Sequence, residues 1–196
     1  FIIPELREGR GEAVLARSGA YQNIITDAAL KGVLHNHSAW SDGMHSLEEM
    51  ALYARELGLQ YLGICDHSRT AVYANGLDIG RVQAQHAEIE LLNRKIDGFK
   101  ILKGIESDIL GDGSLDYPED VLKTFDFVVA SVHQNLKMDE ERATTRVIKA
   151  VENPYTTILG HPTGRLLLSR PGYPLDHKKV IDACAQNGVA IEINAH

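Results

Sequence analysis

Histidines and carboxylates recur at intervals along this 196-residue chain, which holds nine histidines and 27 Asp and Glu residues. Those that matter most lie at or just after short apolar stretches. They are His35, His37, Asp42, His67, Glu106, His133 and His161. Imidazole nitrogens and carboxylate oxygens are the ligands that zinc and manganese take from proteins. The set exceeds what one ion needs, so the sequence predicts two or three divalent ions, Mn²⁺ or Zn²⁺, with Glu106 bridging because a carboxylate has two oxygens.

The first of these residues form a His-x-His pair. Residues two apart in a strand face the same side, so His35 and His37 are expected to bind one ion together. Asp42 follows in a Ser-Asp-Gly turn. Such a pair alone is a weak signal, and a single histidine at a strand end is often a hydrogen-bonded structural residue. The prediction depends on the whole set lying together.

The segments between these residues alternate between strand and helix patterns. Strands are expected at 32–37, 60–67, 99–109, 125–133, 156–161 and 188–196, and helices at 46–59, 78–96, 118–123, 139–151 and 176–187. Ser46 and Glu49 have the spacing of a capping box. Such alternation predicts an α/β fold with a parallel sheet covered by helices. A barrel is favoured because the carboxyl ends of its strands share one face, where the ligands would meet.

Composition narrows the class of protein. The hydrophobic content of 44% and charged content of 24% are typical of a globular domain, and no apolar run is long enough to span a membrane. A net charge of -7 argues against a stand-alone nucleic-acid binder but suits a domain that collects cations. Cys65 and Cys184 lack CxxC spacing, which favours a reducing cytoplasm. The start without Met is expected of a piece of a longer polypeptide.

The motifs LHNH, SDG, CDHS, GIES, SVH and GHP, in this order, resemble the PHP (polymerase and histidinol phosphatase) superfamily over essentially the whole chain. The resemblance is greatest to the C-terminal PHP domain of bacterial X-family DNA polymerases. PELREGRGE near the start is similar to the connector that precedes the domain there. On this basis residues 1–30 are expected to be a connector and residues 31–196 a PHP metal-dependent phosphoesterase domain.

The resemblance implies a distorted (β/α)7-type barrel with a trinuclear metal site. It implies three ligand sets: His35, His37 and Glu106; Glu106, His133 and His161; and Asp42 with His67. It also implies a 3′–5′ exonuclease or related phosphoesterase, usually manganese-dependent, that acts on a DNA 3′ end beside a polymerase domain on the same polypeptide. The chemistry expected is attack of a metal-bound hydroxide on the phosphodiester, with no serine or cysteine nucleophile.

The chain departs from the family at its end. The family completes its site with an Asp-x-His pair after a seventh strand, and the printed sequence stops at His196, before that strand. The barrel is therefore expected to lack its last strand in this chain, which would leave the first and third ions one ligand short. His196 stands where the family commonly has Asn, so it is not counted as a ligand.

Several neighbouring residues carry two interpretations each. Asp66 either orients a ligand imidazole or caps backbone amides. Arg165 either binds a substrate phosphate or is an ordinary exposed loop residue. Trp40 and Tyr73 border the ligand loops, where either can stack on a base, and Trp40 can equally cover the barrel mouth. The remaining candidates are expected to lie outside the site: His45, His86, His177 and Cys65.

Two other functions compete with the nuclease. One is a small-molecule phosphomonoesterase of the histidinol phosphatase type, since a fold does not fix a substrate. The other is a non-catalytic metal-binding structural module. The PELREGRGE segment favours the polymerase context over both.

Overall fold

The structure is a computed structural model that describes residues 9, 11–19, 25–166 and 168–193. The chain divides into two compact units, residues 1–30 with 195–196, and residues 31–194. In the first unit the described residues form the short helix α1 (Glu12–Arg17) and a 3-10 turn, η2 (Asp27–Ala29). Most of the PELREGRGE segment and His196 lie outside the described residues, and the connector assignment stays a prediction.

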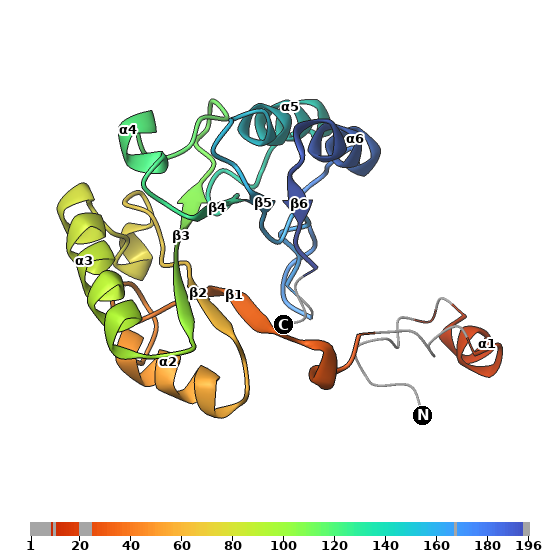
Figure 1. Cartoon of the computed structure of the whole chain (residues 1–196). Coiled ribbons are helices and arrows are strands. Elements are labelled where there is room, and N and C mark those ends of the chain that lie inside the picture. The colour runs from red at the N-terminus through yellow and green to blue at the C-terminus, as the bar shows by residue number, and fades with distance from the viewer. Residues whose placement is uncertain (1–8, 10, 20–24, 167, 194–196) are drawn as a thin grey trace. The chain divides into compact units, whose positions relative to one another are not determined.

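The second unit is built on six strands that follow one another in space as they do in sequence. They are β1 (Gly32–Asn36), β2 (Tyr61–Ile64), β3 (Lys100–Asp108), β4 (Phe127–Ser131), β5 (Ile158–Leu159) and β6 (Ala190–Ile191). Every neighbouring pair is parallel. The sheet curls from β1 to β6 as an open half-barrel in the described part of the chain (Figure 1). The predicted α/β fold with a parallel sheet is confirmed.

The sheet turns at β3. Residues 100–103 of this strand pair with β2, and residues 104–108 pair with β4. The change of partner falls at Gly104, where an added Cβ would lie 2.2 Å from the Phe127 ring and 2.5 Å from the Ile64 carbonyl oxygen. Only glycine allows the backbone and this ring to approach so closely. The turn at β3 brings the carboxyl ends of all six strands toward a common centre.

Helices connect the strands. They are α2 (Leu47–Glu56), the 3-10 turn η3 (Val72–Ala74), α3 (Ile79–Lys95), α4 (Glu119–Leu122), α5 (Glu140–Val151) and α6 (His177–Asn187). The capping box of Ser46 and Glu49 is present, and Asp78, Asp139 and Asp176 cap α3, α5 and α6 through their side chains. Each cap satisfies a backbone N–H that the first helical turn leaves unpaired. The boundaries expected from sequence agree with these helices to within a few residues.

Two apolar clusters attach the helices to the sheet. The first joins α2 and α3 to β2 and β3 and includes the fully buried Ile64 and Ile89. The second joins α5 and α6 to β3, β4 and β5 and includes Val147 and Leu159. Burying one such side chain contributes about 1.5–3 kcal/mol. No helix in the described residues is long and apolar enough to cross a bilayer.

Candidate metal centre

An ionisable side chain stands at the carboxyl end of every strand. In strand order these residues are His35, His67, Glu106, His133, His161 and Glu192. Because the strands are parallel, these ends lie along the same edge of the curled sheet. A backbone bridge between His67 and Glu106 continues the pairing of β2 with β3 beyond the regular part of β2. The backbone itself therefore sets the imidazole of the second strand beside the carboxylate of the third.

Glu106 is the centre of the cluster, and its side chain is 1% exposed. Five imidazoles surround its two carboxylate oxygens. Oε1 lies 3.1 Å from His35 Nε2, 3.1 Å from His133 Nε2 and 2.7 Å from His161 Nε2, and Oε2 lies 3.0 Å from His67 Nδ1 and 3.5 Å from His37 Nε2. The structure thus brings together all five histidines selected from the sequence. A buried carboxylate with five imidazoles has the donor chemistry of a multinuclear metal site.

Asp42 closes the cluster on the solvent side. Its side chain is 47% exposed, and its two oxygens lie 3.2 Å from His37 Nδ1 and 3.6 Å from His67 Nε2. It reaches this position from the loop between β1 and α2. Asp42 therefore offers a carboxylate at the mouth of the site, while Glu106 offers one at the bottom.

Two of the histidines have unusual backbone conformations. His35 has φ 60° and His161 has φ 22°, in the left-handed region that non-glycine residues rarely adopt. In β1 the pairing with β2 shifts register between Val33 and Asn36, which is where His35 lies. The strand is therefore irregular at His35 and ends before His37, so simple alternation does not describe the pair, although one donor group contains both residues as expected. Both still reach Glu106, and such strain is typical of functional sites.

Three groups of donor atoms lie within 4.8 Å of one another among the described residues. They are His35, His37 and Glu106; His37, Asp42 and His67; and His67, Glu106 and His133. The first group and the Asp42–His67 pair match sets implied by the family resemblance. The third differs, since it includes His67 where the resemblance implies His161. How ligands divide among ions, and how many ions bind, stay predictions.

Two buried nitrogens support a fit to cations. His37 Nδ1 and His67 Nδ1 are buried without a hydrogen-bond partner in the described structure. Asp42 Oδ1 lies 3.2 Å from His37 Nδ1, and Glu106 Oε2 lies 3.0 Å from His67 Nδ1, but neither contact has the direction of a hydrogen bond. Burying an imidazole nitrogen without a partner is unfavourable, and a divalent cation would satisfy it. The residues present therefore fit divalent ions.

Two further carboxylates, which the sequence interpretation missed, hold the imidazoles in place. Glu192 lies with Oε1 2.6 Å from His35 Nδ1, and its Oε2 accepts the backbone N–H of His161 at 2.7 Å. Asp108 contacts His133 Nδ1 and also accepts a hydrogen bond of 2.9 Å from the Thr70 hydroxyl. A carboxylate on Nδ1 fixes the ring so that Nε2 faces inward. Both residues were visible as strand-end carboxylates, in GIESD and IEIN.

Asp66 has a different role from these two. Its oxygens accept hydrogen bonds from the Ser38 backbone N–H at 2.7 Å, the Ser38 hydroxyl at 2.6 Å and Gln85 Nε2 at 2.6 Å. These bonds order the loop that separates His37 from Asp42. The interpretation of Asp66 as a residue that caps backbone amides is confirmed, and the alternative, that it orients an imidazole, is wrong for the described contacts.

The other candidates lie at the rim or away from the site. His45 and His177 are exposed, and Cys65 is buried in the core. Trp40 is half-buried and donates its indole N–H to Glu88 at 2.9 Å. Tyr73 is 69% exposed, with its ring centroid 6.1 Å from that of His67, so it borders the cluster. Arg165 is exposed in the loop after His161, and its role in binding substrate stays a prediction.

The cluster perturbs the pKa values of its members in opposite directions. Burial works to raise the pKa of Glu106, but hydrogen bonds from His133, His161 and His35 outweigh it and hold that pKa well below its usual range. Burial works to lower the pKa of His35 and of His133. In both, contacts with two carboxylates prevail and raise the pKa to about 9. The carboxylates therefore make the cluster attract positive charge, whether protons or metal ions.

A model of the PHP domain family matches residues 34–196. The chain belongs to the PHP domain family. It is 42% identical over 195 residues to the "DNA polymerase/3′-5′ exonuclease PolX" of Bacillus subtilis (strain 168), covering all of this chain and 34% of that protein. It is 36% identical over 172 residues to a "probable phosphatase" of Thermoanaerobacter sp. (strain X514), covering 84% of this chain and 65% of that protein. This PHP chain thus spans about a third of the first relative and under two thirds of the second.

A solved structure shares the fold of this PHP domain. It is histidinol phosphate phosphatase from Lactococcus lactis, complexed with zinc, L-histidinol and phosphate. The TM-score is 0.55 at 16% identity, over 84% of this chain and 73% of that one. At this identity the likeness concerns the fold alone. The predicted family is confirmed, and membership in it supports the prediction of a metal-dependent phosphoesterase.

Proposed function

We propose that this PHP domain is a metal-dependent phosphodiesterase that removes nucleotides from the 3′ end of DNA, as part of an X-family DNA polymerase. One observation carries the proposal: five imidazoles surround the buried Glu106 at the carboxyl ends of parallel strands, and the Asp42 carboxylate lies beside two of them. The 42% identity to a protein named as both polymerase and 3′-5′ exonuclease supports the nuclease over other phosphoesterases.

The residues have distinct parts in this function. Glu106 would bridge ions held by the five histidines, and Asp42 would bind at the solvent side. Bound divalent ions supply an activated water and neutralise charge on the phosphoryl oxygens. Glu192 and Asp108 keep the imidazoles oriented, which maintains Nε2 as the ligand atom. Arg165, after His161, would contact a substrate phosphate.

The test is elemental analysis of the purified chain followed by turnover in added MnCl₂. The proposal predicts two or more Mn or Zn ions per chain, in line with the donor groups, and release of mononucleotides from the 3′ end of a single-stranded oligonucleotide. Retention of all label by an oligonucleotide labelled at its 3′-terminal nucleotide would contradict it.

A phosphomonoesterase acting on a small metabolite is the second candidate. It is favoured by the relative named as a probable phosphatase and by the fold neighbour that binds L-histidinol and phosphate. Hydrolysis of p-nitrophenyl phosphate without hydrolysis of an oligonucleotide would support it. Fewer than two ions per chain and no turnover of either substrate would instead support a non-catalytic metal-binding module.

The polymerase partner belongs to the same proposal. The chain matches only 34% of the PolX protein, so the remainder of such a protein would carry the polymerase. A cytoplasmic location is also proposed, since Cys65 and Cys184 are both free and buried, a usage common in reducing compartments.

A further inference from the structure

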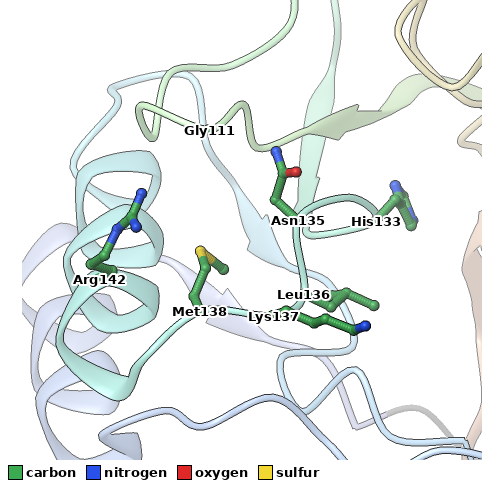
Figure 2. Close-up of a pocket in the computed structure, with 7 residues that line it drawn as sticks. All are labelled: Gly111, His133, Asn135, Leu136, Lys137, Met138 and Arg142. Atoms are coloured by element: carbon green, nitrogen blue, oxygen red, sulfur yellow. The ribbon is translucent and has the colours of Figure 1, made fainter.

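A cavity of about 530 Å³ lies beside the metal centre. His133, whose Nε2 faces Glu106, forms one end of it, and Arg142 on the first turn of α5 lies at the other, with Lys137 on the loop between them (Figure 2). The volume is within the range of small-molecule sites. The cavity therefore extends the metal centre along the surface, on the side of β4 and α5.

The charges around this cavity are unusual for the chain. The whole chain has a net charge of -7, yet the residues that line the cavity include Lys137 and Arg142 and no carboxylate. Among the described residues, neither cation has a carboxylate within ion-pair distance, and both are exposed. Arg142 also lines a neighbouring hollow with two carboxylates, Asp112 and Glu141, and there Asp112 lies 3.5 Å from Lys149 Nζ. Two unpaired cations in an acidic domain point to an anionic ligand.

The walls of the cavity are held in place. Arg146, which is 4% exposed, donates from Nε to the Leu110 carbonyl oxygen at 2.8 Å and from Nη1 to the Gln134 carbonyl oxygen at 2.9 Å. These bonds tie the loop after β3 to the loop after β4. Asn135 has φ 55°, a left-handed conformation in the second loop. The loop that carries Lys137 is therefore anchored next to His133 rather than loosely attached.

We propose that this cavity is a binding subsite for a second phosphate of a polynucleotide, with Lys137 and Arg142 as its contacts. The inference rests on the proposed function, and it adds the place where the strand of that substrate would bind. A phosphomonoester with its phosphorus in the metal cluster would place only its alcohol portion in the cavity, where two cations have nothing to pair with. A strand of nucleic acid has a further phosphate to place there, and Arg and Lys are the side chains that bind it. Leu136 and Met138 supply apolar wall for the sugar or base.

The experiment compares the full chain with the double variant Lys137→Ala/Arg142→Ala in MnCl₂, on a single-stranded oligonucleotide and on p-nitrophenyl phosphate. The double variant loses charged contacts, so its KM for the oligonucleotide should rise. The fold-increase should be roughly ten times that of KM for p-nitrophenyl phosphate. Lys100→Ala is the matched control, because Lys100 is an exposed cation at the opposite, amino-terminal end of β3, and it should leave both KM values unchanged. Equal changes in KM for both substrates, or changes no larger than those in Lys100→Ala, would contradict the proposed subsite.

Binding of a fluorescent oligonucleotide at several NaCl concentrations tests the subsite without turnover. A plot of the logarithm of affinity against the logarithm of salt concentration should be less steep for the double variant, by about 0.7, since each phosphate neutralised on a single strand contributes about 0.7. Identical slopes, or no binding by the unchanged chain, would refute the subsite. A chain that binds as predicted yet hydrolyses no phosphoester would refute the proposed function and leave the subsite standing.

Discussion

Two histidines with little exposed surface, His86 and His133, show what separates a packing residue from a site residue. His86 on α3 lies edge-on to Phe125, with ring centroids 4.9 Å apart, and its Nε2 has no hydrogen-bond partner in the described structure. Burial, helped by the nearby charge of Lys103, lowers the pKa of His86 to about 4. His133 is buried to a similar degree, but its two nitrogens face Asp108 and Glu106, and its pKa rises to about 9.

The difference lies in the partners rather than in burial. Burial alone makes an imidazole neutral and inert, because the charged form loses its hydration. At His133, carboxylates on both nitrogens reverse that effect and favour a cation on or beside the ring. A histidine that faces carboxylates is a candidate ligand, while one that packs on apolar rings contributes to the core. His67 shows that the partners decide this rather than the pKa, since it faces Glu106 although burial lowers its pKa. The predictions that follow test this distinction, from the largest expected effect to the smallest.

Replacing Glu106 by Gln should have the largest effect. The change keeps the volume of the side chain and removes the charge that five imidazoles share, so ion binding and charge neutralisation in the site should fail together. We expect phosphoesterase activity to fall by about 10³-fold or more, since several kcal/mol of charge stabilisation is lost. Bound metal from elemental analysis and initial rates in MnCl₂ measure this. His86→Gln is the control and should keep both, whereas unchanged metal content in Glu106→Gln would refute the bridging role.

Glu192→Gln should have an intermediate effect. The amide retains one acceptor oxygen, but it cannot serve both His35 Nδ1 and the His161 backbone N–H as the carboxylate does. Metal affinity should fall about 10–100-fold, the range for residues that orient ligands. Titration against a chelator of known affinity measures it. Glu88→Gln is a matched control, because Glu88 binds the Trp40 indole and no imidazole. Affinities within twofold of each other would show that Glu192 orients nothing.

The fold was largely predictable because its signals are local. Ser46 and Glu49 define the start of α2, and alternation of apolar strands with helices indicates a parallel sheet. The strands were expected to be longer than they are; the segment 60–67 is regular only over Tyr61–Ile64. The excess falls at both ends of most strands, and at the carboxyl ends the backbone leaves the regular ladder beside the site. Among the ligand candidates, His67, His133 and His161 follow the regular part of their strands, whereas His35 and Glu106 lie within theirs.

The sequence predicted which residues belong to the site but not how they are arranged in space. Residue type and strand-end position selected the histidines and Glu106. The bulge at His35 and the positive φ of His161 depend on how neighbouring strands pair, which no local pattern encodes. The roles of Asp108 and Glu192 depend on which imidazole each faces across 25 and 157 residues of sequence. Such contacts follow from the curl of the sheet, so they needed the structure.

The pH dependence of stability should single out His86. Its pKa is about 4 in the folded chain and near 6.5 when unfolded, so the unfolded chain binds a proton that the folded chain does not. The neutral ring carries no penalty above pH 6.5, and stability is lost as pH falls from about 6.5 toward 4, by at most about 1.4 kcal/mol per pH unit. Urea unfolding of the chain and of His86→Leu at pH 5 and pH 7 measures the difference. Equal losses on acidification in both would mean that His86 does not titrate as its environment requires.

The smallest effect should come from the ring on which His86 packs. Phe125→Leu removes the edge-to-face contact and leaves every carboxylate of the metal centre unchanged, so it should cost about 1 kcal/mol of stability at pH 7 without loss of bound metal. A double-mutant cycle with His86→Leu isolates the pair, with an expected coupling of about 0.5–1.5 kcal/mol. Strict additivity would show that His86 is held by something other than this ring. Loss of metal in Phe125→Leu would mean that a contact between two uncharged rings is needed to keep the distant cluster assembled. Packing histidines and ligand histidines would then not be separate classes in this domain.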